Sequence, residues 1–435
     1  MSTSPVAVRG DVASLDARAR MILFDRSSAS DPQTRERAAH LIARVRADGD
    51  AALFALAREF DGVELESLEV PRAAWRSALT SLPPALRRSL ERAAGNIREV
   101  HEAFRPVPRQ VVTSDGAIIG RRPDPLGRVG VYAPGGRAAY PSSLFMGAVP
   151  ARVAGVGEVV VCSPPGADGK PSVVLMAAAE LAGVDRLFAI GGAGAIAAMA
   201  YGTASVPAVD RIVGPGNAFV AEAKAQVSSV TAIDSPAGPS ELLVLADASA
   251  SPDVVARELL AQAEHDPLAA VVLVSTSGAL LDAVNELLVA WVPREPRARV
   301  IAAALASRGA LLLAANMADA VAFANQWAPE HLLLATQRPL ELLPSVRNAG
   351  TVFLGETAAV AFGDYMSGAN HVLPTGGLSR SYSGLSTIDF YRWTTWQSMD
   401  RATAERFARD VGTFADAEGL PAHAASARQW MEGAR

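Results

Sequence analysis

The sequence has little cysteine, no strong excess of either charge and no long apolar run. The single cysteine among 435 residues cannot form an internal disulfide, and Cys162 follows the apolar run 159–161, which is typical of a buried core position. The net charge is -5, and no dense Lys/Arg run is present to follow a phosphate backbone, so nucleic acid is not expected as a partner. No stretch approaches the ~18 unbroken apolar residues of a membrane span, and residues 1–20 lack the apolar core of a signal peptide. We therefore expect no membrane association and a cytoplasmic location.

The length and the local patterns predict several domains. A chain of 435 residues and 45.2 kDa is too long for one compact core. The first hundred residues are predicted to be helical throughout, because Asp31-Pro32 and Pro83-Pro84 are helix starts and residues 91–104 have helical spacing. The tail at 402–431 is also predicted to be helical, as a small C-terminal appendage.

Two series of short apolar runs alternate with helical segments. The first series lies at 129–131, 159–161, 187–190 and 212–213, and the second at 242–245, 271–274, 311–313 and 352–354. Such alternation is typical of βαβ units with a parallel sheet. Because the pattern is repeated, we expect an α/β protein with two similar domains.

Glycine-rich loops follow two of the predicted strands, at 191–194 and 214–217. Neither has the Gly-x-Gly-x-x-Gly spacing of a dinucleotide site. Each joins a strand to a helix, which allows backbone N–H groups to face a phosphate. Taken alone, they are compatible with a nucleotide site or with ordinary tight turns.

Four of the six histidines stand beside other polar groups that can bind a metal or transfer a proton. They are His265 with Gln262, His331 with Glu330, His371 near Asp364, and His423 near Glu418. This grouping predicts one assembled site. His40 and His101 lie in charged helical stretches, where we expect solvated imidazoles without a role.

A helix is predicted from Pro252 to His265, with Ser251 as its N-cap. Gln262 and His265 extend its apolar face, so they could bind a divalent metal or simply hydrogen-bond to each other. Further ligands would have to come from elsewhere, and Asp364 and His423 are candidates. Each also has an ordinary alternative, as a turn aspartate and a helix-flanking histidine.

Glu330 and His331 follow Pro329 and precede the apolar run 332–334. An adjacent acid and imidazole suggest proton transfer. Since neighbours on a helix diverge, we expect the two to act on different protons and not on each other. The alternative is an exposed helix N-terminus, where an acid is favoured by the dipole.

Eight ordered motifs together resemble the histidinol dehydrogenase family, and the resemblance covers nearly the whole chain. They lie at 132–136, 213–217, 236–241, 262–265, 327–331, 363–365, 370–376 and 418–423. The resemblance implies oxidation of L-histidinol to L-histidine through the bound aldehyde with two NAD, the last steps of histidine biosynthesis. It also implies two incomplete Rossmann-like domains with parallel sheets, a helical N-terminal lead-in and a helical C-terminal appendage.

The resemblance further implies domain bounds. They are an N-terminal helical arm at 1–26, a zinc and catalytic domain at 27–131 and 241–384, an NAD-binding domain at 132–240, and a tail at 385–435. The tail is expected to contribute to the site of the other subunit of a homodimer.

Site roles follow from the same resemblance, position by position. One zinc ion per subunit is expected on Gln262, His265, Asp364 and His423, the last supplied by the partner subunit. Glu330 and His331 are the expected catalytic pair: His331 accepts the hydroxyl proton and Glu330 activates the water that attacks the aldehyde. The expected substrate contacts are Ser240, Gln262, His265, His331, Asp364, His371, Glu418 and His423, with Glu418 also shared across subunits, and the expected NAD contacts are Tyr132 and Asn217.

One position departs from the family pattern. Gly194 stands where many relatives carry a glutamine that contacts NAD, so one cofactor hydrogen bond is in doubt. Three alternatives to the main hypothesis stay open at this point: a related zinc and NAD enzyme that oxidises another amino or hydroxy alcohol, a zinc hydrolase, and a non-catalytic zinc-stabilised dimer.

Overall fold

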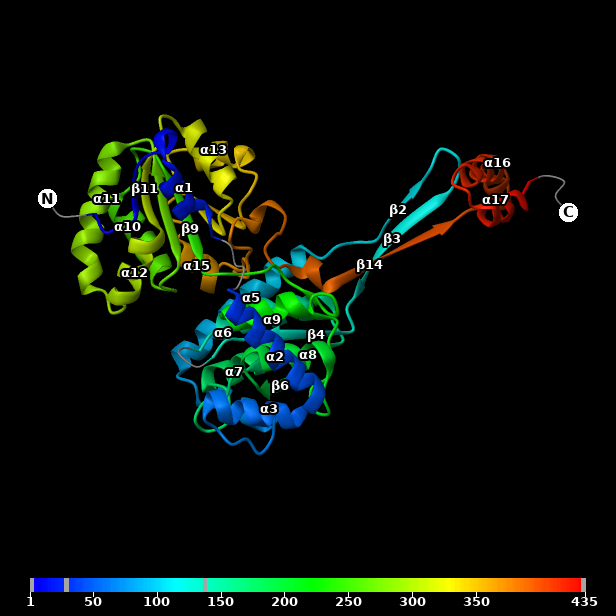
Figure 1. The fold of residues 1–435 in the computed structure, drawn as a ribbon, viewed down its shortest axis with the longest axis horizontal. Helices are drawn as coiled ribbons and strands as arrows, with labels where there is room; N and C mark the ends of the chain where they lie inside the picture. The colour runs from blue at the N-terminus through cyan, green and yellow to red at the C-terminus, as the bar shows by residue number, and fades with distance from the viewer. Residues whose placement is uncertain (1–3, 27–30, 136–138, 432–435) are drawn as a thin grey trace. The chain divides into compact units, whose positions relative to one another are not determined.

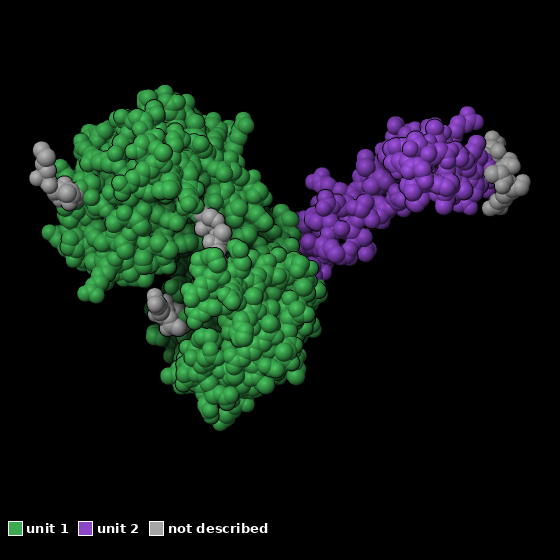
Figure 2. Space-filling model, viewed as in Figure 1, with its two compact units in different colours: residues 1–104, 127–390 green, residues 105–126, 391–435 purple. Residues whose placement is uncertain are grey.

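The computed structural model describes residues 4–26, 31–135 and 139–431. The chain forms two compact units (Figure 2), one of residues 1–104 and 127–390 and the other of residues 105–126 and 391–435. The first unit contains two separate parallel sheets with helices around them (Figure 1). Among the described residues, no helix has both the length and the apolar character that crossing a membrane requires.

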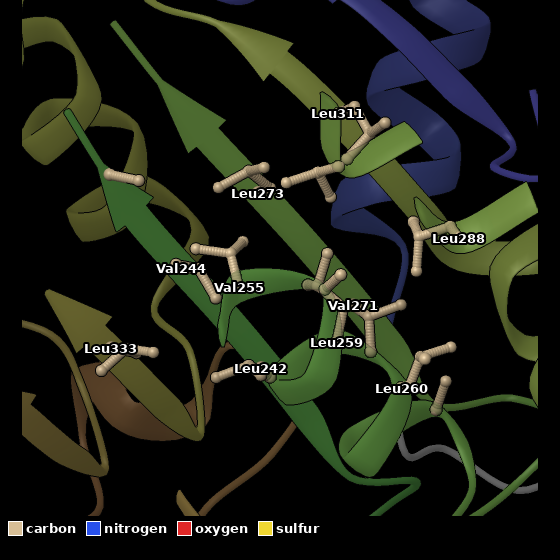
Figure 3. Close-up of a cluster of buried hydrophobic side chains, with 14 of the residues drawn as sticks. Leu242, Val244, Val255, Leu259, Leu260, Val271, Leu273, Leu288, Leu311 and Leu333 are labelled. Atoms are coloured by element: carbon tan, nitrogen blue, oxygen red, sulfur yellow. The ribbon is translucent and has the colours of Figure 1, made fainter. Parts of the chain in front are cut away.

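The larger sheet has six parallel strands in the order β1-β11-β10-β9-β12-β13. Leu242 and Val244 of β9 pack with α10 (Pro252–Ala263) on one face (Figure 3), whereas Leu243 and Leu245 enter a second core on the other face. Both faces are therefore covered, which explains the almost continuous apolar runs of these strands. The strands are β1 (Val8–Asp11), β9 (Glu241–Ala246), β10 (Ala270–Ser275), β11 (Gly309–Leu313), β12 (His331–Ala335) and β13 (Thr351–Leu354).

Helices cover the two faces of this sheet. The first core lies beneath α10 (Pro252–Ala263), α11 (Gly278–Trp291) and α12 (Ala298–Arg308). The second core includes residues of α1 (Ala17–Phe24) and α13 (Met317–Trp327). Two short helices, α14 (Pro339–Leu342) and α15 (Val360–Tyr365), follow β12 and β13.

The smaller sheet has five parallel strands in the order β6-β5-β4-β7-β8. Numbered from its first strand, this is the order 3-2-1-4-5, and β9 to β13 repeat it in the larger sheet. The prediction of two similar α/β domains with parallel sheets is therefore confirmed. The elements are β4 (Arg128–Tyr132), α6 (Pro141–Ala154), β5 (Glu158–Ser163), α7 (Val173–Ala182), β6 (Arg186–Ala189), α8 (Gly192–Tyr201), β7 (Arg211–Val213), α9 (Ala218–Val227) and β8 (Ala232–Ile233).

The N-terminal region departs from prediction in two ways. Residues 8–11 form β1, a parallel edge strand on β11, where only helix was expected. Helices α2 to α5 do form, and Asp31 caps α2 as predicted, but they pack on the smaller sheet: Ile42, Val45 and Leu53 share a core with Phe188. The predicted catalytic domain, which groups residues 27–131 with 241–384, is thus wrong for these helices. Their apolar stripes predict that one face is buried but do not specify which sheet that face covers. Their bounds are α2 (Pro32–Asp48), α3 (Asp50–Leu56), α4 (Arg72–Ser81) and α5 (Pro84–Ala103).

The second unit combines a three-stranded antiparallel sheet with two helices. Its strands are β2 (Arg109–Val112), β3 (Ile118–Pro125) and β14 (Tyr391–Ser398), and its helices are α16 (Arg401–Ala417) and α17 (Pro421–Arg428). The helical tail is confirmed, but the aromatic segment before it is a strand. The ring of Trp396 lies against Gly120 of β3, so closely that a Cβ atom there would be 2.1 Å from it.

A buried acid and imidazole pair as the candidate active site

Glu330 and His331 lie at the start of a buried strand and not on a helix. His331 is the first residue of β12, and its neighbour Glu330 follows Ala328-Pro329 in the loop after α13. Only 5% of Glu330 and 4% of His331 are exposed, so the alternative of an exposed helix N-terminus is wrong. Ala328 has a left-handed φ of 53°, which is uncommon for a residue with a side chain and is found at functional sites.

The backbone of Glu241 holds both side chains. Its N–H donates to Glu330 Oε2 at 2.6 Å, and its carbonyl oxygen lies 2.9 Å from His331 Nδ1. His331 Nδ1 is also 3.4 Å from Glu330 Oε2, so the two side chains converge, contrary to the expected divergence. The reason is that Glu330 lies in the loop before the strand, where neither helical nor strand alternation applies.

These bonds leave the other imidazole nitrogen free. Because Nδ1 donates to the Glu241 carbonyl, Nε2 is the nitrogen available to a ligand. It is buried 3.9 Å from Asp364 Oδ1 and has no hydrogen-bond partner among the described residues. Burial lowers the pKa of His331, but the Glu330 and Asp364 carboxylates raise it to about 9. The pocket at this point is lined by His331, Thr351, Phe353, Gly363, Asp364, Ala369, Asn370, His371 and Leu373.

Asp364 and His371 meet at the end of α15. The carbonyl oxygen of Asp364 lies 3.1 Å from His371 Nδ1, and His371 Nε2 lies 3.4 Å from the Ser143 hydroxyl. Burial lowers the pKa of His371, which favours the neutral ring. Asn370 donates to the carbonyl of Met146 at 2.8 Å, so this loop contacts both α/β halves of the first unit.

Gln262 and His265 lie at the carboxyl end of α10. The helix ends at Ala263, two residues earlier than predicted; Gln262 is buried and His265 is exposed. One turn earlier, the Glu258 carboxylate accepts the Val360 N–H at 3.0 Å and links α10 to the start of α15. Burial raises the pKa of Glu258, and the nearby Asp364 adds to the rise.

The structure does not bring all predicted site residues together. Glu418 and His423 belong to the second unit, where both are exposed. Among the residues that the structure describes, no three His, Cys, Asp or Glu side chains group as a metal site. Ser240 lies beside Glu241, and its carbonyl accepts the Ala270 N–H at 3.1 Å.

Tyr132 and the 214–217 loop lie at adjoining strand ends in the five-stranded sheet. Tyr132 ends β4 and Gly214 follows β7, the neighbouring strand, at the point where the strand order reverses. The Tyr132 hydroxyl accepts the Gly192 N–H at 3.1 Å, and burial raises its pKa to about 12. Asn217 is exposed and caps α9 with its side-chain oxygen, which leaves its NH₂ group for a ligand.

A buried ion pair that the sequence analysis missed supports this loop. Lys224 pairs with Asp234, and both side chains are at least 95% buried, with exposures of 5% and 4%. Lys224 Nζ also donates to the Gly214 carbonyl at 3.0 Å, while Asp234 accepts the Gly214 N–H at 2.7 Å. No local pattern marked either residue, because the pair forms only when α9 packs beside β8.

Two further positions bear on the predictions. Gly194 is buried in α8, and a Cβ atom there would be 2.8 Å from Leu56, so Leu56 occupies the space beside it. His40 is exposed, as expected, but His101 is only 2% exposed, so its expected solvation is wrong. His101 Nδ1 accepts the Thr387 N–H at 3.3 Å, and burial lowers the pKa of His101 to about 4.

Comparisons with known proteins agree with one another. The family model described as histidinol dehydrogenase matches residues 24–431. The chain is 44% identical over 419 residues to the histidinol dehydrogenase of Bordetella parapertussis, covering 96% of this chain and 94% of that protein. It is 47% identical over 394 residues to that of Xanthomonas campestris pv. campestris, covering 90% and 91%. The crystal structure of histidinol dehydrogenase from Elizabethkingia anophelis is similar with a TM-score of 0.94 at 30% identity, covering 99% of each chain.

Proposed function

The chain belongs to the histidinol dehydrogenase family of oxidoreductases in histidine biosynthesis, and from this premise we propose how its residues divide the reaction. The substrate is L-histidinol, oxidised first to the bound aldehyde and then to L-histidine, with one zinc ion per subunit and two NAD. The observation that carries the assignment of chemistry is the free, buried His331 Nε2 beside Asp364. Family membership decides against the zinc hydrolase and non-catalytic alternatives.

We assign zinc to Gln262, His265, Asp364 and His423 of the partner subunit. The donor set suits zinc, because imidazole and carboxylate are ordinary zinc ligands and a side-chain amide oxygen completes them. Two observations support the proposal. Glu258 ties α10 to α15, and among the described residues of one chain no three His, Cys, Asp or Glu side chains group as a metal site, so a ligand from a second chain would complete the set. When bound, zinc would orient the substrate amine and imidazole and polarise its hydroxyl oxygen.

His331 and Glu330 handle the protons in this proposal. In its neutral form, which becomes populated as the pH rises toward the pKa of about 9, His331 takes the hydroxyl proton on Nε2 as hydride leaves the carbinol carbon. After the aldehyde forms, Glu330 takes a proton from the attacking water; its Oε2 is held by the Glu241 N–H, which leaves Oε1 for this task. The resulting hydrate anion then loses the remaining hydride of this carbon and a hydroxyl proton to give the carboxylate. The first oxidation thus releases one hydride and one proton, and the second, which consumes one water, releases one hydride and two protons.

Substrate contacts are assigned to Ser240 and His371, and to Glu418 of the partner subunit. Ser240 precedes Glu241, whose backbone holds the catalytic pair, and His371 lines the same pocket as His331 and Asp364. NAD, which accepts the hydride in each step, is assigned to Tyr132 and Asn217. The support for that site is the position of Tyr132 and Gly214 at the reversal of strand order, where open α/β sheets bind nucleotides.

The first test is product stoichiometry. Purified, zinc-loaded protein is given limiting L-histidinol, and the NADH and histidine formed are counted with and without a chelator. We expect two NADH per histidinol and loss of turnover after zinc removal. One NADH with accumulation of aldehyde would contradict the four-electron assignment, and full activity without metal would remove zinc from the proposal.

The shared site has its own test. His265→Ala and His423→Ala should each lose zinc and activity. After the two variants are unfolded and refolded together, half of the dimers are mixed and each has one complete site, so about a quarter of wild-type activity returns. If both ligands came from the same chain, no mixed dimer would recover activity.

A further inference from the structure

Glu241 makes four polar contacts at the base of the catalytic pair. Its backbone N–H and carbonyl hold Glu330 and His331, as described above. Its buried carboxylate accepts the Gly376 N–H at 2.8 Å through one oxygen and pairs with Arg26 through the other. The backbone and the side chain of Glu241 therefore both have hydrogen-bond or ion-pair partners.

Arg26 joins the two chain segments that carry the pair. Besides Glu241, its guanidinium donates to the backbone carbonyl of Trp327, three residues before Glu330. Its Cζ atom also lies over the Trp327 ring, 3.6 Å from the ring centroid, while the Trp327 indole N–H donates to the Leu23 carbonyl at 2.8 Å. The Arg26 side chain is only 2% exposed. One cation thus connects the end of α1, the end of α13 and the start of β9.

We propose that Arg26 and Glu241 are positioning residues that set the orientation of Glu330 and His331 for proton transfer. The Glu241 peptide can fix the two side chains only while its own position is fixed, and the ion pair with Arg26 holds it there. The carbonyl contact keeps the proton of a neutral His331 on Nδ1 and so keeps Nε2 as the base. Neither residue lines the pocket, so they act through the pair and not on the substrate.

A planar guanidinium suits this role better than an ammonium group. It donates to the Trp327 carbonyl, pairs with the Glu241 carboxylate and packs on an aromatic ring with one planar group, whereas lysine is a flexible point charge. Small misplacement of catalytic groups by a remote change lowers turnover up to about 100-fold. We therefore expect Arg26→Met to lower kcat about 10- to 100-fold, and Arg26→Lys to have an intermediate effect.

The experiment measures kcat, the KM for histidinol and bound zinc for Arg26→Met, Arg26→Lys and the double variant Arg26→Met/Glu241→Gln. The double variant removes both charges, so no buried charge is left unpaired and the fold is protected. We expect low kcat in all three, with KM and zinc content within about threefold of wild type. Arg186→Met is the matched control: it removes an ion pair with Glu69 at the edge of the smaller sheet and should leave kcat unchanged.

Wild-type kcat in the double variant would overturn the proposal, because the pair would then serve only to neutralise charge. A fall in kcat that follows loss of zinc or of folded protein would overturn it as well. The inference rests on the proton-transfer roles of Glu330 and His331, which Glu330→Gln and His331→Asn test separately. If those variants remain active, the proposed function fails; if they are inactive while Arg26→Met is not, only this inference fails.

Discussion

The two α/β halves of the larger unit share a strand order but place their candidate chemistry at opposite edges. In the five-stranded sheet, Tyr132 and Gly214 lie at the carboxyl ends of β4 and β7. In the six-stranded sheet, Glu241 and His331 lie at the amino ends of β9 and β12, the strands in the equivalent positions. Strand order alone therefore does not reveal which edge of a sheet is used.

Electrostatics gives the physical reason for the difference. The amino ends of α8 and α9 lie at the carboxyl edge of the smaller sheet, and their partial positive charge favours the phosphates of a nucleotide. The amino edge of the larger sheet collects helix carboxyl ends, including that of α10 with Gln262, and their partial negative charge favours a cation. At its opposite edge, Asp247 accepts the N–H groups of Ser249 and Gln337 at 2.9 and 3.0 Å, which ties the loops after β9 and β12 together.

The strongest test of the amino edge is removal of its base. His331→Asn should lower kcat about 1,000-fold, because general acid and base catalysis contributes in this range. Zinc content and the affinity for NAD should not change, since neither is assigned to His331. Steady-state kinetics with metal analysis checks this, and turnover within a few fold of wild type would place the chemistry elsewhere.

The buried imidazole of His101, in the smaller half, predicts a loss of stability in acid. Burial lowers the pKa of His101 to about 4 in the folded protein. At pH values between this pKa and the higher pKa of the unfolded chain, only the unfolded chain binds the proton. Stability is therefore lost as the pH falls, by about 2 kcal/mol between about pH 7 and about pH 5. Urea unfolding of wild type and His101→Gln measures it. The variant should lose less stability than wild type over this range, and equal losses would contradict the assignment.

A substitution at the carboxyl edge should affect NAD and not zinc. Gly214 has a φ of +112°, and a Cβ atom there would be 2.1 Å from the Tyr132 carbonyl oxygen, so Gly214→Ala must displace the loop. We expect the KM for NAD to rise about tenfold or more, from strain of about 1–2 kcal/mol together with the clash. Gly183→Ala is the control: its φ is +68°, but its surroundings are open. A loss of bound zinc larger than the loss of NAD affinity would contradict the assignment of NAD to this edge and of zinc to the amino edge of the larger sheet.

The smallest effect is expected for Tyr132→Phe. The change removes one neutral hydrogen bond to the Gly192 N–H, worth about 0.5–1.5 kcal/mol, so the KM for NAD should rise about two- to tenfold. Kinetics at saturating histidinol measures this rise. An unchanged KM would show that the hydroxyl does not support the cofactor loop.

The local patterns of the sequence determined most of the elements. Proline and aspartate marked the starts of α2 and α5, and the apolar runs marked β4, β5, β6, β7, β9, β10, β11 and β13. The apolar run 332–334 after His331 does not by itself predict β12, because a short apolar run is equally compatible with a strand and with a buried helix. The motifs identified the family and so the candidate site residues, which the geometry then grouped only in part.

Only the tertiary structure decided the partners of these residues. Arg26 with Glu241, Lys224 with Asp234 and His101 with Thr387 are contacts within one fold, and the first and last join segments more than 200 residues apart. Propensity and periodicity act over a few residues, so they determine which segments are helices and strands. Which buried polar groups satisfy one another depends on how those segments pack, and that packing decided the orientation of His331 and the edge of each sheet at which the candidate site residues lie.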